Sequence, residues 1–255
     1  MEDNLFDTVT DLVREFKPVS LSEMDQVKLM DRIDSKFVLP FCTLPAILQC
    51  LSSGYYVLTI KEMKAFNYQT DYFDTPGLNM YFDHHNGRPN RYKVRQREYV
   101  ESAIKFIEVK FKNNKGRVKK ERIQIHTNDQ DFGSFVKNAT PYHPDDLSII
   151  LTNRFNRFTL VDYNFSERVT VDFNLVFNDN TNKVRLTDLV IIEVKQSKAS
   201  RQSLIFKALR QYGLHPESFS KYCLGVSLLN RTPKINNFKH TVNLINKLSH
   251  VELSA

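Results

Sequence analysis

Cationic side chains alternate along the stretch KVRQREY, residues 93–99. In a β-strand, successive side chains point to opposite faces, so Lys93, Arg95 and Arg97 would share one face with Tyr99. Like charges at this spacing repel one another unless an anion neutralises them. Arginine offers paired planar donors and lysine a compact point charge, and both suit phosphate oxygens. The stretch therefore predicts a surface that binds a polyanion.

Other stretches with strand-like alternation also divide into an apolar and a charged face. RVTVDFNL, for example, places Arg168, Thr170 and Asp172 opposite Val169 and Val171. An antiparallel sheet with one face in water would show the same alternation. The charged faces, however, carry twelve cations and four anions, an excess of eight, whereas the formal net charge of the whole chain is +7. The positive charge is therefore concentrated in one place. The cations are Arg32, Lys36, Lys93, Arg95, Arg97, Lys110, Lys112, Lys120, Arg122, Arg157, Arg168 and Lys195, and the anions are Asp34, Glu108, Asp172 and Glu193.

An antiparallel β-barrel, closed or nearly closed, would bring these charged faces together around a cationic lumen. A chain of phosphates in the lumen would neutralise the cations. The few acids would then hold a divalent metal, because Mn²⁺ or Mg²⁺ prefers oxygen ligands shared between carboxylate and phosphate. The sequence contains no G-x-x-x-x-G-K-[ST] and no G-x-G-x-x-G motif, so we do not expect a glycine-rich phosphate loop.

The elements that would position these side chains form a single α+β domain over residues 1–255. It comprises N-terminal helices over 1–30, a tunnel barrel over about 31–197 and C-terminal helices over 199–248. His84 and His85 fall in a predicted loop, where a solvated pair is expected rather than a metal site. The spacing predicts helices at 4–16, 21–30, 43–52, 129–138, 144–148, 199–212, 219–229 and 235–248. It predicts strands in most of the stretches between 32 and 126 and near 150–161, 166–176 and 187–196.

Composition is ordinary for a folded protein, with 41% hydrophobic and 25% charged residues and a pI near 9.2. The three cysteines form no C-x-x-C pair, which favours a reduced protein without a zinc site. No secretory signal and no apolar run of roughly 20 residues is present, so we expect no membrane span and a cytoplasmic location.

Seven stretches, in order between residues 32 and 225, resemble the VTC (vacuolar transporter chaperone) polyphosphate polymerase family. They are RIDSKFVLP, YFDTPGL, RYKVRQREY, FIEVKFKNNKGRVKKER, RVTVDFNL, VIIEVKQS and SFSKYCLG. This family lies within the triphosphate tunnel metalloenzyme, or CYTH-like, superfamily. The resemblance implies a β-barrel tunnel that binds a triphosphate or a phosphate chain. It also implies transfer of the γ-phosphate of ATP onto a growing polyphosphate chain, with Mn²⁺ or Mg²⁺.

The resemblance also assigns roles to individual residues, several of which the charged faces had already singled out. Arg157 resembles the arginine of a family Tyr-x-Arg pattern in which Phe155 replaces the tyrosine. The predicted catalytic residues are Lys36, Arg95, Arg97, Lys110, Lys120, Arg157 and Arg168. The predicted phosphate-binding residues are Arg32, Lys93, Lys112, Arg122, Lys195, Ser220 and Lys221, and the predicted metal ligands are Glu193, Glu108 and Asp172.

One departure bears on the reaction. Hydrolases and cyclases of the superfamily open with Glu-x-Glu-x-Lys, whereas Arg32 occupies the first acidic position here. The loss of that acid argues against a triphosphatase or a cyclase. Two alternatives to the polymerase remain: a triphosphatase on the same fold, and a non-enzymatic module that binds polyphosphate, nucleotide or RNA. The expected partners are ATP or another triphosphate and inorganic polyphosphate; an unidentified protein partner is left open, and DNA is not expected.

Overall fold

The computed structural model describes residues 2–25, 33–125, 129–197, 200–229, 232, 234–248 and 252–254. Arg32 and the end of the helix predicted at 21–30 lie outside these residues. The helices are α1 (Glu2–Glu15), α2 (Leu21–Asp25), α3 (Leu44–Leu51), α4 (Asn79–His85), α5 (Asp129–Ala139), α6 (Leu204–Gln211), α7 (Lys221–Leu228) and α8 (Lys239–Leu248). The strands are β1 (Lys17–Val19), β2 (Ile33–Pro40), β3 (Tyr55–Leu58), β4 (Ala65–Asp74), β5 (Arg91–Tyr99), β6 (Ile104–Lys112), β7 (Val118–Ile125), β8 (Ser148–Asp162), β9 (Glu167–Asn178), β10 (Lys183–Leu186), β11 (Leu189–Gln196) and β12 (Glu252–Ser254).

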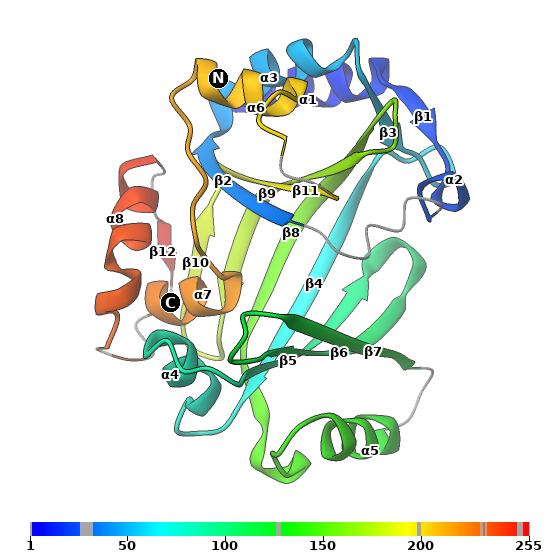
Figure 1. Ribbon diagram of the computed structural model, residues 1–255. Helices are drawn as coiled ribbons and strands as arrows, with labels where there is room; N and C mark the ends of the chain where they lie inside the picture. The colour runs from blue at the N-terminus through cyan, green and yellow to red at the C-terminus, as the bar shows by residue number, and fades with distance from the viewer. Residues whose placement is uncertain are drawn as a thin grey trace.

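The strands form one strongly curved, mostly antiparallel sheet (Figure 1). The strands that carry the charged faces follow the order β7-β6-β5-β4-β8-β9-β11-β2. The long strand β9 pairs with β11 along its first half and with β10 along its second half. The stretch predicted as one strand at 187–196 is therefore β11, preceded by the separate strand β10. The short strands β1 and β12 were not predicted, and β1 pairs in parallel with β3.

The curved sheet does not close into a barrel within the part of the chain that the structure describes. Its two ends are β2 and β7, which do not pair with each other. Closing the gap would bring Lys36 of β2 towards the lysines of β6 and β7. Burial is the main cause that lowers the pKa of Lys110 on β6, and the positive charge of Lys36 already lowers it further. The barrel expected from the sequence, closed or nearly closed, is an open, curved sheet with a charged concave face in the described part of the chain.

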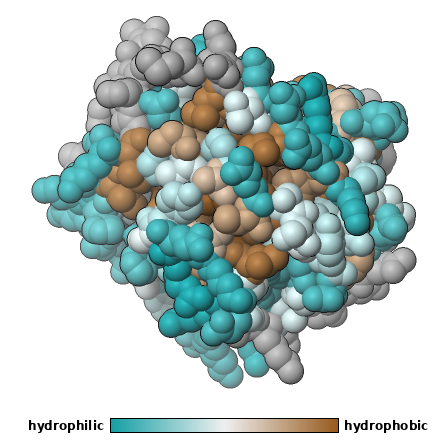
Figure 2. Space-filling model, turned by 90° about the horizontal axis from the view of Figure 1, so that it is seen from above, coloured by the Kyte–Doolittle hydropathy of each residue, from teal (hydrophilic) through white to brown (hydrophobic). Residues whose placement is uncertain are grey.

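Helices cover the convex face of the sheet at both ends. At one end α1, α3 and α6 bury apolar side chains of β2, β8, β9 and β11, such as Phe37, Phe158 and Ile192. At the other end α5 packs against Val94 and Val109. Figure 2 shows the face over α1, α3 and α6 from above, with apolar side chains gathered near the centre and hydrophilic ones around them. Phe6 and Leu204 are the large apolar residues of these helices with the most exposure, at 40% each.

Helix α7 lies against the concave face and fills one end of it (Figure 1). The helix packs so tightly that a Cβ atom at Gly225 would lie 2.7 Å from Cδ1 of Phe177 and 3.0 Å from Cδ2 of Leu151. Tyr222 of α7 donates a hydrogen bond to Asp74, whose carboxylate also accepts backbone N–H groups of α4. These contacts fix α7 and α4 together, so the first residues of α7 face the charged part of the lumen.

Candidate functional site

The concave face collects charged residues from seven strands and α7. Residues paired directly in an antiparallel ladder project to the same face, so the registers give the rows of the site. Arg95 pairs with Glu108, which pairs with Arg122; Lys93 pairs with Lys110. These rows carry the cations that the sequence placed on one strand face. The corresponding rows on the other wall are Arg157–Asp172, Lys36–Glu193–Thr170–Thr159 and Asp34–Lys195–Arg168–Val161.

Glu108 anchors one wall of the site. Its Oε2 atom accepts Nε and Nη2 of Arg95 at 2.6 and 2.5 Å, and its Oε1 atom accepts Nζ of Lys120. Burial raises the pKa of this carboxyl group, but the charges of Arg95, Arg97 and Lys120 outweigh burial and lower it to about 2. Glu108 is therefore an ionised counter-charge that holds Arg95 and Lys120 in place.

Asp172 plays the same part on the opposite wall. Arg157 donates to both of its oxygens, from Nε at 2.5 Å and from Nη2 at 2.8 Å, and Lys221 of α7 donates to Oδ2. Burial opposes ionisation, but Arg157 and Lys221 hold the pKa of Asp172 at about 2. Nζ of Lys221 also lies 3.3 Å from the ring centroid of Phe155. Burial, with the charges of Arg157 and Arg97, lowers the pKa of Lys221 to about 7 despite the attraction of Asp172.

Glu193 is held more loosely than the other two acids. Its Oε2 atom accepts Nζ of Lys195 at 2.6 Å, while its Oε1 atom lies 3.8 Å from Nζ of Lys36. Burial raises its pKa, but Lys195 and Lys36 shift it well below the usual range for a glutamate. Oε1 of Glu193 is therefore an ionised oxygen with only a distant cation beside it.

Lys93 and Ser220 meet at the end of the lumen that α7 fills. Nζ of Lys93 donates to Oγ of Ser220 at 2.8 Å, and Ser220 caps α7 by accepting the N–H of Cys223. Burial lowers the pKa of Lys93 to about 8. The two residues are separated by 127 positions in the sequence, and only the fold brings them together.

Histidine 84 and Cys223 form a contact that the sequence did not predict. His84 and His85 belong to α4, not to a solvated loop: His85 is buried, and Nδ1 of His84 lies 2.9 Å from Sγ of Cys223. Burial, together with the charges of Lys93 and Arg91, lowers the pKa of His84 to about 2. The histidine is therefore neutral at physiological pH. No signal in the sequence pointed to this pair, because its two residues lie 139 positions apart.

The remaining predicted residues lie nearer the margins of the concave face. Arg168 is half-buried beside Lys195 in the ladder, and Lys112 is half-buried at the end of β6. Arg122 is exposed, with its guanidinium 4.7 Å from the ring centroid of Phe106. The site is thus densest around Arg95, Arg97 and Arg157, and Arg32 lies outside the described residues.

The acids of the site are not arranged as a protein-built metal cage. Among the described residues, no three His, Cys, Asp or Glu side chains gather closely enough to hold a metal ion. Arginine and lysine side chains already bind both oxygens of Glu108 and both oxygens of Asp172. Oε1 of Glu193 has only the more distant Lys36 beside it. Mg²⁺ and Mn²⁺ are often held by one or two carboxylates together with substrate phosphates. The donor set fits a metal of that kind, with Glu193 as the protein ligand.

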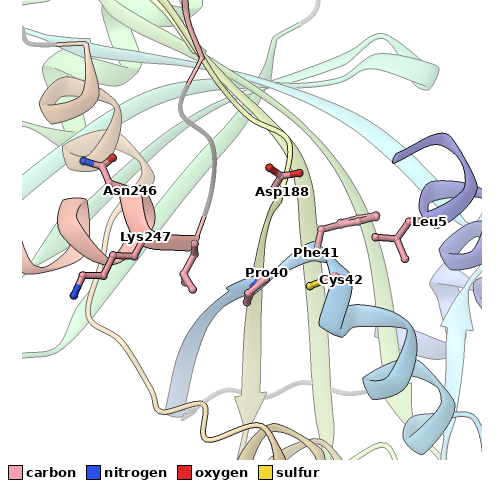
Figure 3. Close-up of a pocket in the computed structure, with 8 residues that line it drawn as sticks. Leu5, Pro40, Phe41, Cys42, Asp188, Asn246 and Lys247 are labelled. Atoms are coloured by element: carbon pink, nitrogen blue, oxygen red, sulfur yellow. The ribbon is translucent and has the colours of Figure 1, made fainter. Parts of the chain in front are cut away.

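A pocket of about 300 Å³ lies elsewhere, between the end of β2, the start of α1 and α8 (Figure 3). Figure 3 shows Pro40, Phe41 and Cys42 on one side of it and Asn246 and Lys247 on the other. Apolar atoms make up much of its lining, and none of the predicted site residues contributes to it. The pocket is not part of the candidate site. No helix among the described residues combines the length and apolar character needed to cross a membrane.

The fold and the site together define a protein with an open, curved antiparallel sheet whose concave face is lined by partly buried cations. The profile of the VTC domain family matches residues 31–230, and the chain belongs to this family. No protein of curated function matches the sequence.

Several solved structures align with the chain at low sequence identity. HpAC1 from Hippeastrum, a candidate adenylyl cyclase described as having a dominant triphosphatase activity, aligns with a TM-score of 0.50 and 16% identity, over 77% of this chain and 95% of that one. A candidate adenylate cyclase from Vibrio parahaemolyticus aligns with a TM-score of 0.46 and 15% identity, over 75% and 95% of the two chains. The PH1819 protein from Pyrococcus horikoshii aligns with a TM-score of 0.44 and 12% identity, over 76% and 96%.

Proposed function

We propose that this protein is a metal-dependent polyphosphate polymerase that transfers the γ-phosphate of ATP onto a growing polyphosphate chain along the concave face. Arg97 is the observation that carries the anion-binding part of the proposal. It is only 8% exposed and projects into the lumen, yet it forms no ion pair with any described residue and donates to Thr70 at 3.3 Å. The charge of Glu108 acts on Arg97 only from a distance, since its oxygens bind Arg95 and Lys120. A buried cation without an ion-pair partner in contact is costly, so an anionic ligand is the natural partner.

The state of the acids favours a phosphate acceptor over water. Hydrolysis usually requires a free general base to take a proton from the attacking water. Glu108 and Asp172 are ion-paired through both oxygens and have pKa values of about 2, so neither suits that role. Glu193 has a less engaged oxygen, but Lys195 and Lys36 hold its pKa well below the usual range, which makes it a weak base, and it is the proposed ligand of the metal. The terminal oxygen of a polyphosphate chain is already ionised and needs no base. This argument, together with Arg32 in place of the first acid of the hydrolase motif, supports the polymerase over a triphosphatase.

In this mechanism the protein binds, aligns and neutralises phosphate groups. Arg95, held by Glu108, and Arg157, held by Asp172, line up phosphate oxygens along the lumen together with Arg97. Lys93 and Lys221 bind the end of the chain beside α7, and Ser220 positions Lys93. A divalent metal held by Glu193 would supply further neutralisation of charge on the phosphate oxygens. Loss of one preorganised cation is expected to lower the rate by about 10²–10³-fold.

The test is incubation of the purified protein with ATP, Mn²⁺ and a pyrophosphate primer. Products are resolved on a polyphosphate-staining gel beside an assay for free phosphate, with Arg97→Ala and Glu193→Ala as variants. Long polymer that disappears in both variants supports the proposal. Free phosphate without polymer would replace the polymerase with a triphosphatase. If neither product forms but polyphosphate binds and Arg97→Ala abolishes binding, the protein is a binding module.

A further inference from the structure

Thr170 lies at the middle of the concave face on β9. In the ladder it is paired with Glu193 of β11 on one side and with Thr159 of β8 on the other. Its neighbours along the strand, Val169 and Val171, belong to the apolar core on the convex side, which places the threonine on the concave side. Only 5% of Thr170 is exposed. The residue thus forms part of the floor of the lumen.

Within the part of the chain that the structure describes, the hydroxyl group of Thr170 has no hydrogen-bond partner. Among the described residues, the only buried side-chain nitrogen or oxygen atoms in this state are Oγ1 of Thr170, Oδ1 of Asn153 and Oγ of Ser203. A buried hydroxyl without a partner costs about 1–3 kcal/mol, so native proteins usually satisfy such groups. The amide oxygen of Asn153 is an acceptor and cannot receive an anion, and Ser203 precedes α6 on the opposite side of the sheet. Of the residues described, Thr170 is therefore the one that places a buried, unsatisfied donor on the concave face.

The charges around Thr170 are those of the phosphate site. Arg168 and Asp172 lie on the same face of β9 as Thr170, two residues before it and two residues after it. Arg157 and Lys195 lie in the rows that flank the Thr170 row. Burial is the main cause that lowers the pKa of Lys195, and the charge of Arg157 lowers it further. These two cations therefore act on each other across the threonine. An anion between them would lie against the hydroxyl.

We propose that Thr170 is a phosphate-binding residue whose hydroxyl donates a hydrogen bond to a non-bridging oxygen of the bound phosphate chain. This inference rests on the proposed function, since it needs a phosphate chain in the lumen. A neutral donor is useful here because it binds the anion without adding to the repulsion among the surrounding cations. The hydroxyl is left without a partner in the free protein and gains one when the ligand binds.

Two substitutions separate this role from a structural one. Thr170→Val keeps the β-branched shape and removes the hydroxyl, whereas Thr170→Ser keeps the hydroxyl and removes a methyl group. Sodium tripolyphosphate is titrated into each protein by calorimetry in buffer with EDTA, so that no metal contributes. Hydrogen bonds to charged groups contribute about 1.5–3 kcal/mol, which predicts an affinity about 10- to 100-fold weaker for Thr170→Val. Thr170→Ser is expected to stay within about threefold of the wild type.

Thermal unfolding of the ligand-free proteins completes the test. Thr170→Val should unfold at the same temperature as the wild type or higher, because it removes an unsatisfied buried hydroxyl. If the wild type does not bind tripolyphosphate, both the proposed function and this inference fail. If the wild type binds and Arg97→Ala weakens binding but Thr170→Val does not, the inference alone fails. An equal loss of affinity in both threonine variants, or a lower unfolding temperature for Thr170→Val, would show that the residue serves packing and overturn the inference.

Discussion

Arg157 and Asp172 form a bidentate ion pair that joins β8 to β9 on the floor of the concave face, with N···O distances of 2.5 and 2.8 Å. Lys221 of α7 binds the same carboxylate. This single acid therefore connects the sheet to the helix that fills one end of the lumen. Asp172 is almost fully buried, so the arrangement places ionised groups where water does not screen them.

Replacing Asp172 with alanine should destabilise the fold strongly. The change leaves Arg157 and Lys221 buried without their counter-charge, and breaking a buried ion pair in this way typically costs about 3–5 kcal/mol. Urea unfolding followed by circular dichroism measures the loss. Glu121→Ala is a suitable control because its ion pair with Lys119, at 2.9 Å, is exposed and should contribute at most about 1 kcal/mol. Similar losses in the two variants would contradict the structural role given to Asp172.

Polyphosphate binding should weaken as pH rises above about 7. Lys221 has a pKa of about 7 in the free protein because burial and the charges of Arg157 and Arg97 disfavour its protonated form. A bound phosphate chain favours that form and raises the pKa, so binding takes up a proton. The affinity should therefore be constant well below pH 7 and fall by up to tenfold per pH unit above it, until the pKa of the complex is reached.

Calorimetry with long-chain polyphosphate in two buffers of different ionisation enthalpy measures this proton uptake directly. Lys221→Arg retains the positive charge over the whole range, since arginine does not deprotonate in proteins. The variant should therefore lose part of the uptake near pH 7 while Lys93 and Lys120, with pKa values of about 8, still contribute at higher pH. Unchanged uptake near pH 7 in Lys221→Arg would rule out Lys221 as its source.

The sequence predicted well whatever depends on alternation along a single strand. It placed Lys93, Arg95 and Arg97 on one face, and the ladders confirm that they share the concave side with Glu108 and Lys110. It could not predict which acid holds which cation, because the pairing of Lys221 with Asp172 depends on how a helix packs 49 positions away. The open edge between β2 and β7 likewise depends on how strands far apart in the sequence are arranged, which no local pattern encodes.

The way in which α7 packs against the sheet also could not be predicted from the sequence. Gly225 offers a way to test the importance of this packing. Alanine at this position would place Cβ 2.7 Å from Cδ1 of Phe177, so either the helix or the buried side chains of Phe177 and Leu151 must shift. We expect a loss of about 1–3 kcal/mol in stability, typical of overpacking, and weaker polyphosphate binding as Ser220 and Lys221 move. Gly133→Ala in α5 is the matched control: a Cβ there meets nothing within 4 Å, and alanine favours a helix. Equal stability of the two variants would show that α7 is not packed as described.

Lys119 and Lys120 are neighbours on β7 that project to opposite faces, so replacing either one with alanine gives two variants of identical composition and net charge. Lys120 binds Glu108 and faces the lumen, whereas Lys119 is 71% exposed and pairs with Glu121. Lys120→Ala removes a lumen cation and leaves one oxygen of Glu108 without its partner, so polyphosphate affinity should fall at least tenfold and any phosphoryl transfer by about 10²–10³-fold. Lys119→Ala should change neither by more than about twofold. Binding is measured at two salt concentrations. Both variants lose one positive charge and therefore the same general, salt-dependent attraction for the anion. Any additional loss in Lys120→Ala reports a specific contact with the ligand. Equal losses in the two variants at both salt concentrations would contradict a ligand bound on the concave face.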